Sequence, residues 1–293
     1  MRISTSYQYS AFQSNIDSAG QALFKIQQEI SSGKRINTPS DDPFGTTQVM
    51  QSTELQAGLT QYMANLNTAQ GSLTFTDQAL SNTSTLATQA YQYAVSGANA
   101  ATDQQSRDAM AQEVATLQQQ LVQLANSQGP SGQYLFAGQQ NATAPFAVNG
   151  NTLSYSGDGN DVIVQTSPTD TMVVNTQGQA MYTDLYNQLE SLKNDLQGGN
   201  SGALSDTDIS ALQGSINTVN SARGEVGAKL QLVTNLTSQY QTRSDQLTTS
   251  ISNVQDVNMA QAISDYGSAS LAYQAALSVA TQGFKMSILN FIQ

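Results

Sequence analysis

The chain has 293 residues, a formal net charge of −11, only ten lysine and arginine residues in all, and neither cysteine nor histidine. So few basic side chains argue against nucleic-acid binding, and the missing cysteine and histidine exclude disulfides, thiolate metal sites and the most common catalytic bases and nucleophiles. We therefore expect no cofactor, no metal and no enzymatic activity, and the lack of any run of about 18 apolar residues argues against a membrane span.

The N-terminal segment predicts an amphipathic helix with a narrow apolar face. Its apolar residues recur at alternating spacings of three and four, and we call five of them the N-terminal stripe: Phe12, Ile16, Leu23, Ile26 and Ile30. This is the spacing of coiled-coil helices, which are marginal in water unless another helix covers the apolar face. A break follows in residues 31–43, where Gly33, two prolines and two aspartates cluster.

Two long helices are predicted next. Asp42 precedes Pro43 and suits the N-cap of a helix with proline at its first position. Apolar residues then keep the three-four spacing from residue 55 to residue 94. Thr102 or Asp103 is expected to cap a second helix, which ends at Gly129 and Pro130.

Residues 133–180 have a different pattern, typical of a small β-rich domain inserted between helices. Asn149-Gly150 lies between two short strand-like segments and predicts a hairpin, and two more strands are expected at residues 162–164 and 171–174. Residues 156–161 are rich in Asp, Asn and Gly, which is a composition also found in calcium loops. These residues lack alternating ligands and a suitably spaced glutamate, so a turn is the favoured interpretation.

The chain then returns to helices. Residues 181–196 predict a short helix, and Ser205 with Asp208 resembles a capping box that opens a last long helix. Arg223 lies on the apolar face of that helix and either extends past it or pairs with a carboxylate on a neighbouring helix. The last segment carries a second run of apolar residues at three-four spacing, and we call five of them the C-terminal stripe: Ile263, Tyr266, Tyr273, Leu277 and Phe284.

These elements predict a mainly α fold: a long antiparallel helical coiled-coil rod made from both chain ends, with a small inserted β-rich domain. Residues 1–40 and 252–293 form the expected terminal helical assembly domain, disordered or frayed in the monomer. Residues 41–132 and 181–251 form the helical rod, and residues 133–180 form the β-rich insertion. Both stripes are interpreted as assembly interfaces, although the core of an intramolecular bundle would have the same pattern.

Several motifs resemble those of one family. Residues 30–37 (Ile-Ser-Ser-Gly-Lys-Arg-Ile-Asn) and 40–43 (Ser-Asp-Asp-Pro) resemble the segment that follows the first helix in the flagellin superfamily. Residues 1–5, 132–138 (Gly-Gln-Tyr-Leu-Phe-Ala-Gly) and 144–146 are similar to those of its hook-filament junction proteins, and residues 221–228 resemble a further helical motif of the superfamily. The residues that carry the motifs of the rod domain are Gly33, Lys34, Arg35, Asp41, Asp42, Arg223 and Gly227.

The resemblance implies a structural, non-catalytic protein of the bacterial flagellum that lies outside the cell. Its expected partners are copies of itself, the neighbouring junction protein on the hook side, flagellin and a flagellar export chaperone, with no nucleic acid and no membrane. Residues 1–20 lack the continuous apolar core of a signal peptide, which fits the flagellum's own type III export route. The alternatives are a minor flagellin, a secreted coiled-coil effector or adhesin, and, third, an enzyme.

Two pairs of charged residues have competing interpretations. Asp41 and Asp42 are expected to act as helix caps rather than as a catalytic carboxylate pair. Lys34 and Arg35 form either a solvated turn or a contact to an acidic neighbouring subunit.

Overall fold

The computed structural model describes the backbone of residues 2–292 and the side chains of residue 7 and residues 9–283. The fold is mainly helical, which confirms the predicted class. The elements are α1 (Arg2–Ser32), α2 (Pro43–Ala98), α3 (Gln104–Ala125), β1 (Phe146–Asn149), β2 (Thr152–Tyr155), β3 (Ile163–Gln165), β4 (Thr171–Val173), α4 (Gln179–Gly198), α5 (Ser201–Ala203), the π-helix η1 (Leu204–Asp208), α6 (Ile209–Gln255) and α7 (Met259–Ile292). Within the described residues, no helix combines the length and apolar character that crossing a bilayer requires.

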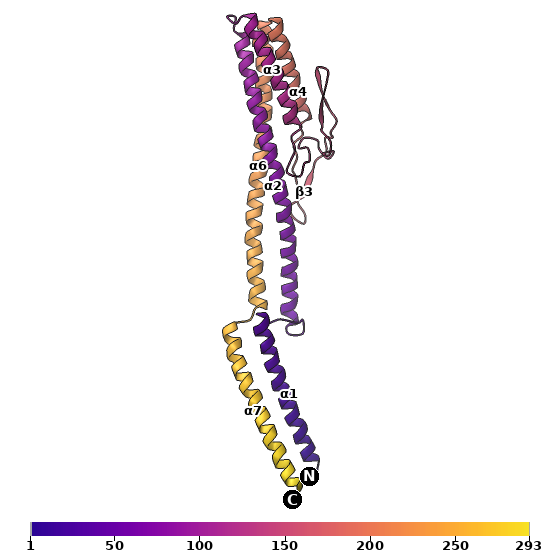
Figure 1. Ribbon diagram of the computed structural model, residues 1–293, viewed down its shortest axis with the longest axis vertical. Helices are drawn as coiled ribbons and strands as arrows, with labels where there is room; N and C mark the ends of the chain where they lie inside the picture. The colour runs from indigo at the N-terminus through magenta and orange to yellow at the C-terminus, as the bar shows by residue number, and fades with distance from the viewer. Residues whose placement is uncertain (1, 293) are drawn as a thin grey trace. The chain divides into compact units, whose positions relative to one another are not determined.

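The chain forms two compact units. The terminal unit contains residues 1–58 and 242–293, and the central unit contains residues 59–241. Figure 1 shows the helices of each unit and the position of the β-strands. Helices α2 and α6 contribute residues to both units, so the division falls inside continuous helices rather than in loops.

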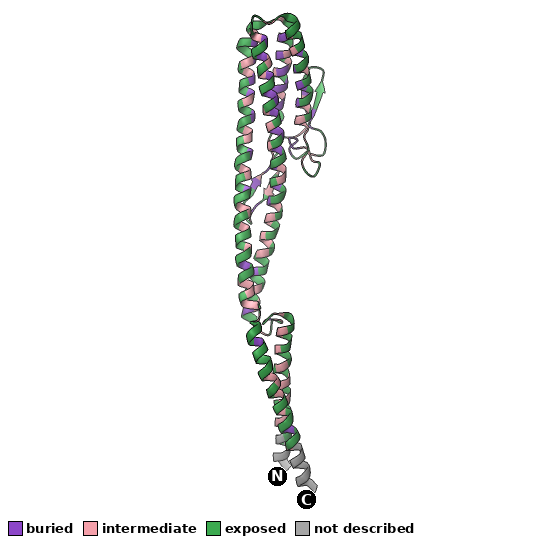
Figure 2. Cartoon of the chain, turned by 60° about the vertical axis from the view of Figure 1, so that its left-hand side comes forward, coloured by how far each residue is buried: buried purple, intermediate pink, exposed green. Residues whose placement is uncertain are grey.

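The central unit has a well-packed helical core. Helices α3 and α4 pack against each other, and residues of α2 and α6 complete the same apolar cluster. Of the leucines at the predicted three-four positions of α2, Leu66, Leu73 and Leu80 are fully buried, as are the leucines of α4, whereas Leu55 near the start of α2 is 57% exposed. Asp103 caps α3, because its Oδ1 accepts a hydrogen bond of 2.8 Å from the amide of Ser106. Buried residues (purple in Figure 2) are concentrated in this unit.

The β-strands form two separate antiparallel pairs, β1 with β2 and β3 with β4. The hairpin predicted at Asn149-Gly150 is confirmed, and Gly150 adopts a φ of 62° in its turn. An aromatic cluster attaches this region to α4: the ring of Tyr182 lies 4.9 Å from that of Phe136 and 5.5 Å from that of Phe146. Tyr182 is fully buried, so a two-stranded hairpin that would be marginal alone gains a helix to pack on.

The predicted start of the last long helix is wrong. The chain is already helical at residue 201, and residues 204–208 form a π-helical turn that leads directly into α6. Ser205 therefore caps nothing, and its Oγ donates to the carbonyl of Gly202 instead. The wider π-helical turn directs the side chains of Leu204 and Asp208 toward the protein interior, where they are 0% and 2% exposed. Gly97 of α2 makes room for this packing, because a Cβ there would lie 3.5 Å from Leu204 and within 2.3 Å of Leu196.

The terminal unit has little buried core. Helices α1 and α7 lie side by side along their length (Figure 1). Among its described residues only four apolar side chains are buried: Ile36, Leu247, Ala262 and Ala280. Its apolar residues are therefore mostly half-buried or exposed.

Candidate assembly surface

The N-terminal stripe faces α7. Its five members are half-buried on one face of α1, which is the face that α7 covers. The two helices approach closely, because a Cβ at Gly20 would lie 3.4 Å from the ring of Tyr273 and one at Gly283 would lie 2.8 Å from the ring of Phe12. Glycine at these two positions lets aromatic rings of the opposite helix pack against backbone. The N-terminal stripe thus packs within the chain.

The C-terminal stripe divides between two faces of α7. Ala262 and Ala280, at 4% and 1% exposure, are the buried residues of the face toward α1. Of the predicted stripe, Tyr273 is half-buried, whereas Ile263, Tyr266 and Leu277 are 59%, 38% and 38% exposed. The side chain of Phe284 lies outside the described residues.

The reason for this division is the size of the side chains. Alanine and glycine let α1 approach closely, and the bulky residues lie on the adjacent face of α7, a fraction of a turn away. Met259 continues their three-four spacing and is 44% exposed. We call Met259, Ile263, Tyr266 and Leu277 the outer α7 stripe. The sequence signal for the α1-facing side was the row of alanines at residues 262, 269, 276 and 280, which recur at helical spacing. The prediction overlooked them because it selected bulky apolar residues.

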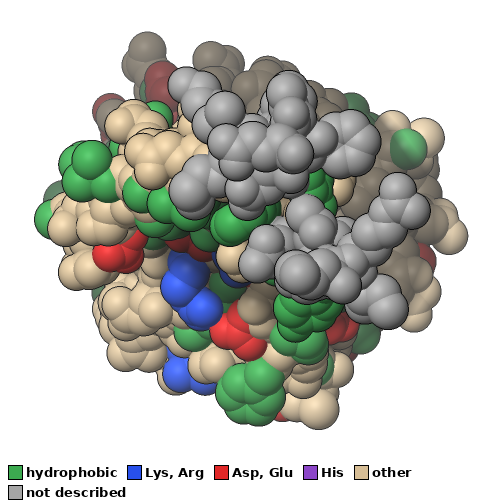
Figure 3. Space-filling model, turned by 90° about the horizontal axis from the view of Figure 1, so that it is seen from below, with side chains coloured by type: hydrophobic (Ala, Val, Ile, Leu, Met, Phe, Trp, Pro, Cys, Tyr) green, Lys and Arg blue, Asp and Glu red, His purple; other side chains and the backbone are tan. Residues whose placement is uncertain are grey.

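Further apolar side chains of the terminal unit are exposed. Phe24 on α1 is 68% exposed, and Leu271 and Val279 on α7 are 69% and 56% exposed. In the view of Figure 3, hydrophobic side chains lie exposed among uncharged polar groups, and charged side chains are few. Exposed apolar residues in such number mark surfaces that other molecules cover.

Residues 33–42 are joined to residues 254–257 in an arrangement that we call the linker clamp. Gly33, with a φ of 71°, accepts a hydrogen bond of 3.0 Å on its carbonyl from the amide of Val257. The amide of Arg35 donates to Gln255, and its guanidinium donates to the carbonyl of Val254 at 2.8 Å and to Asp42 Oδ2 at 3.1 Å. The clamp therefore connects the α1–α2 link to the α6–α7 link. Neither predicted interpretation of Arg35 included these contacts within the chain, and the residue 254–257 side carries no sequence signal because it consists of backbone groups.

Asp42 caps α2, whereas Asp41 does not. Hydrogen bonds to Asp41 Oδ2 from the backbone of Thr38 (2.8 Å) and Asn37 (3.1 Å) hold the turn before α2 and lower the pKa of Asp41, with Lys25 adding a smaller effect. The backbone amide of Gly45 in the first turn of α2, 2.9 Å from Asp42 Oδ1, is the main cause that lowers the pKa of Asp42, and Arg35 follows. The expected helix cap is therefore confirmed for Asp42 and wrong for Asp41. Hydrogen bonds that favour the charged form keep both groups ionised, which does not suit a proton donor.

Lys34 also belongs to the linker clamp. Its side chain is exposed, and its backbone forms an isolated bridge with Asp256. The two residues singled out on α6 belong to the central unit. Arg223 has the second of the two arrangements considered, because its Nε lies 3.2 Å from Asp77 Oδ1 of α2. A Cβ at Gly227 would meet nothing within 4 Å, so no contact within the chain requires glycine there. The structure thus brings the predicted motif residues of the 33–42 segment together in the linker clamp, without Arg223 and Gly227.

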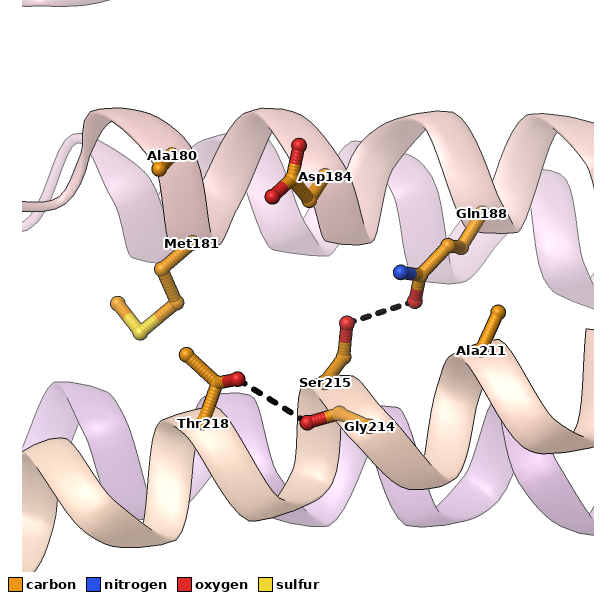
Figure 4. Close-up of a pocket in the computed structure, with 8 residues that line it drawn as sticks. All are labelled: Ala180, Met181, Asp184, Gln188, Ala211, Gly214, Ser215 and Thr218. Atoms are coloured by element: carbon orange, nitrogen blue, oxygen red, sulfur yellow. Dashed lines mark hydrogen bonds between the residues drawn. The ribbon is translucent and has the colours of Figure 1, made fainter.

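A shallow groove of about 240 Å³ lies between α4 and α6 (Figure 4). Ser215 Oγ donates to Gln188 Oε1 at 2.6 Å, and Thr218 Oγ1 donates to the carbonyl of Gly214 at 3.1 Å. These hydroxyls are engaged in structural hydrogen bonds and are not placed beside a base that would activate them. In the part of the chain that the structure describes, no three acidic residues gather as a metal site would need.

Comparison with known proteins shows which proteins the chain resembles. Residues 3–141 match the family model of the bacterial flagellin N-terminal helical region. The chain is 27% identical over 318 residues to flagellar hook-associated protein 3 of Salmonella typhimurium, a match that covers 99% of this chain and 100% of the relative. Among solved structures, Bacillus cereus FlgL aligns with a TM-score of 0.61 at 20% identity, over 69% of this chain and 99% of that one.

A second solved structure, hook-associated protein 3 of Legionella pneumophila, aligns with a TM-score of 0.63 at 12% identity, over 70% of this chain and 98% of that one. At these identities the structures show a shared fold. The family model shows that residues 3–141 are similar to the N-terminal helical region of bacterial flagellin. The full-length match confirms the more specific resemblance, to hook-associated protein 3. Both of these relatives are flagellar hook-associated proteins, and neither is named as an enzyme.

Proposed function

We propose that this protein is a structural adaptor of the bacterial flagellum that joins the junction protein on the hook side to the flagellin filament. It would do so by polymerising through its terminal helices. The observation that carries the proposal is the outer α7 stripe, whose members remain 38–59% exposed although α1 already packs on α7. One helix partner within the chain is not enough to cover the apolar surface of α7.

Burial of that surface supplies the driving force. Covering the exposed part of a residue such as Ile263 or Leu277 contributes roughly 1 kcal/mol. Repeated around an axis, a contact between the outer α7 stripe of one copy and a different surface of the next is heterologous, and it builds rings or helical tubes. The thin core of the terminal unit supports the further proposal that residues 1–40 and 252–293 fray in the monomer and order on assembly.

The remaining parts of the proposal rest on the resemblance to hook-associated protein 3. Copies of the chain, the hook-side junction protein and flagellin are the proposed neighbours in the assembly, and a flagellar export chaperone is the proposed partner before assembly. The protein would reach the outside of the cell through the flagellar export channel.

Deletion of the gene tests the function. We expect cells that keep their hooks but release unpolymerised flagellin into the medium. A strain that still builds a normal filament would instead indicate a minor flagellin. Antibody labelling that fails to mark one band at the hook-filament boundary would favour a secreted effector or adhesin.

Point variants test the mechanism. Ile263→Asp, on the outer α7 stripe, should fail to restore filaments in the deletion strain although the protein is exported. Leu232→Asp is the matched control, because Leu232 is 47% exposed on α6 of the central unit. If Ile263→Asp restores filaments as well as Leu232→Asp does, the outer α7 stripe is not an assembly interface. Full amide protection of both terminal segments in the isolated monomer would contradict folding coupled to assembly.

A further inference from the structure

The π-helix at the start of α6 contains a buried carboxyl group that the assembly function does not use. Asp208 is 2% exposed and lies among the leucines of the central core. Its Oδ1 accepts a hydrogen bond of 3.0 Å from Ser191 Oγ on α4. Its Oδ2 is also buried, and among the described residues it has no hydrogen-bond partner. A buried carboxylate with one oxygen unpaired is unfavourable, so a device that neutralises it would stabilise the fold.

A second carboxyl group lies on the face of α4 that contacts the π-helix. Ser191 on this face donates to Asp208, and Asp195 lies one helical turn further along the same face, where its charge acts on Asp208. Asp195 Oδ1 accepts a hydrogen bond of 3.0 Å from Asn200 Nδ2, and its backbone carbonyl accepts one of 3.1 Å from the amide of Asn200. Asp195 therefore holds the turn between α4 and α5 while it faces the buried acid.

The other charged groups nearby do not neutralise this pair. No ion pair in the described part of the chain includes Asp208 or Asp195. On η1 itself Asp206 is exposed, and α5 has no charged residue. The last turns of α2, next to Leu204, carry none either, and Arg107 of α3 donates to the carbonyl of Thr102 and to Gln104.

We propose that Asp208 and Asp195 share one proton and form a pH-sensitive latch, which closes the π-helix onto α4 in mild acid and loosens when the proton is lost. When protonated, Asp208 can donate a hydrogen bond to the Asp195 carboxylate. When both groups are ionised, two like charges face each other in a poorly solvated place. The π-helix is suited to such a role, because these widened turns often mark positions where a function outweighs regular helix geometry.

The direction of the pH dependence follows from the surroundings of Asp208. Burial raises its pKa from 3.8 to about 6, and the negative charge of Asp195 acts the same way, while the hydrogen bond from Ser191 acts in the opposite direction. The closed state thus holds a proton that the open state loses between pH 4 and 6. Closure is most favourable in acid and weakens as the pH rises through about 6.

Hydrogen exchange of the full-length protein at pH 5 and pH 7.5 tests the latch. After correction for the intrinsic exchange rates, we expect the amides of residues 199–212 to open about tenfold more often at pH 7.5 than at pH 5. This factor follows from a pKa of Asp208 of about 6 in the closed state and 3.8 in the open state. Asp208→Asn should remove this pH dependence, and Asp195→Asn should shift it to lower pH. Asp206→Asn, on the same turn but exposed, should leave it unchanged.

Two results would overturn the proposal. One is wild-type exchange in residues 199–212 that does not change with pH after the correction. The other is an Asp208→Asn protein that keeps the full tenfold change. Because the wild-type measurement needs no variant, the test holds even if one substitution prevents folding.

Discussion

The central and terminal units have the same three-four spacing of apolar residues, but they bury these residues to different extents. In the central unit the three-four positions hold leucines that are fully buried against neighbouring helices, as at Leu73 and Leu189. In the terminal unit the same spacing leaves Leu23 half-buried and Ile263 59% exposed. The difference lies in the number of helices that surround each apolar face. A helix in a bundle has several neighbours to cover it, whereas α1 and α7 have mainly each other.

The two units also differ in the contacts that hold their segments together. The central unit relies on an aromatic cluster and on buried leucines. The terminal unit relies on the hydrogen bonds of the linker clamp, most of which involve residues that are partly exposed to solvent. A unit built this way can keep its local geometry while its apolar surfaces remain free for other molecules. We therefore infer that stability is concentrated in the central unit and association in the terminal unit.

Substitution of one leucine in each unit gives the largest expected difference. Leu189→Ala removes a fully buried side chain of α4 and should lower the free energy of unfolding by about 2–5 kcal/mol. Leu23→Ala, on the half-buried face of α1, should lower it by about 1 kcal/mol or less. Urea unfolding followed by circular dichroism measures both, with the exposed Leu232→Ala as control. Equal losses for Leu189→Ala and Leu23→Ala would contradict the contrast between the units.

Two glycines test how tightly each unit is packed. A Cβ at Gly178 would lie 2.7 Å from the Cβ of Phe136, which is fully buried and cannot move aside, so Gly178→Ala should destabilise the protein by about 1–3 kcal/mol. A Cβ at Gly267 in α7 would meet nothing, so Gly267→Ala should stabilise the monomer by about 0.5–1 kcal/mol. Thermal unfolding of both variants provides the comparison. A stabilising Gly178→Ala would mean that the central unit is less tightly packed than the contacts indicate.

Removal of a cap tests the linker clamp. Asp42→Ala loses the hydrogen bond to Gly45 and the contact with Arg35, so the terminal unit should unfold more readily at neutral pH. Because the pKa of Asp42 is lowered in the folded protein, its contribution is present above the ordinary value of 3.8 and is lost as the pH falls below it.

Hydrogen exchange of the terminal unit at pH 7 and pH 3 measures this, with the exposed Asp17→Ala on α1 as control. The difference between Asp42→Ala and wild type should be clear at pH 7 and smaller at pH 3. An equal difference at both pH values would show that the carboxylate charge is not what stabilises the clamp.

The smallest effect is expected at Arg223. Its contact with Asp77 joins side chains that are 35% and 39% exposed, so solvent screens the pair. A double-mutant cycle of Arg223→Ala and Asp77→Ala should give a coupling energy below about 1 kcal/mol. A coupling well above that value would place part of the central unit's stability in its surface charges rather than in its core.

The sequence predicted the helical elements and their caps well, and for physical reasons. Asp103 and the hairpin at Asn149-Gly150 depend on hydrogen bonds and backbone angles set by residues within a few positions, so local sequence is sufficient. The predicted start of α6 was wrong, although it rested on the same kind of local evidence. Ser205 and Asp208 have the spacing of a capping box, but burial of Leu204 against Gly97 favoured continued helix and a π-turn.

The assembly surface was predicted in part. The spacing located apolar residues on α7 correctly but did not show which of them face α1, because both faces of the helix carry residues at helical spacing. The linker clamp was not predicted. The sequence singled out Arg35 as part of a turn or a subunit contact and Asp42 as a helix cap, but did not indicate that the two pair with each other. The carbonyls of Val254 and Gln255 exist as acceptors at every residue and carry no sequence signal.

The sequence by itself determined the helical class, the inserted hairpin, the resemblance to flagellar junction proteins and the presence of apolar stripes that need a helical partner. These features depend on periodicity, local hydrogen bonding and motifs that can be read along the chain. Only the tertiary structure decided how many helices cover each stripe, and therefore that the alanine face of α7 is covered by α1 while Ile263, Tyr266 and Leu277 remain exposed. Exposure depends on what approaches from elsewhere in the chain, and periodicity along one helix does not contain that information.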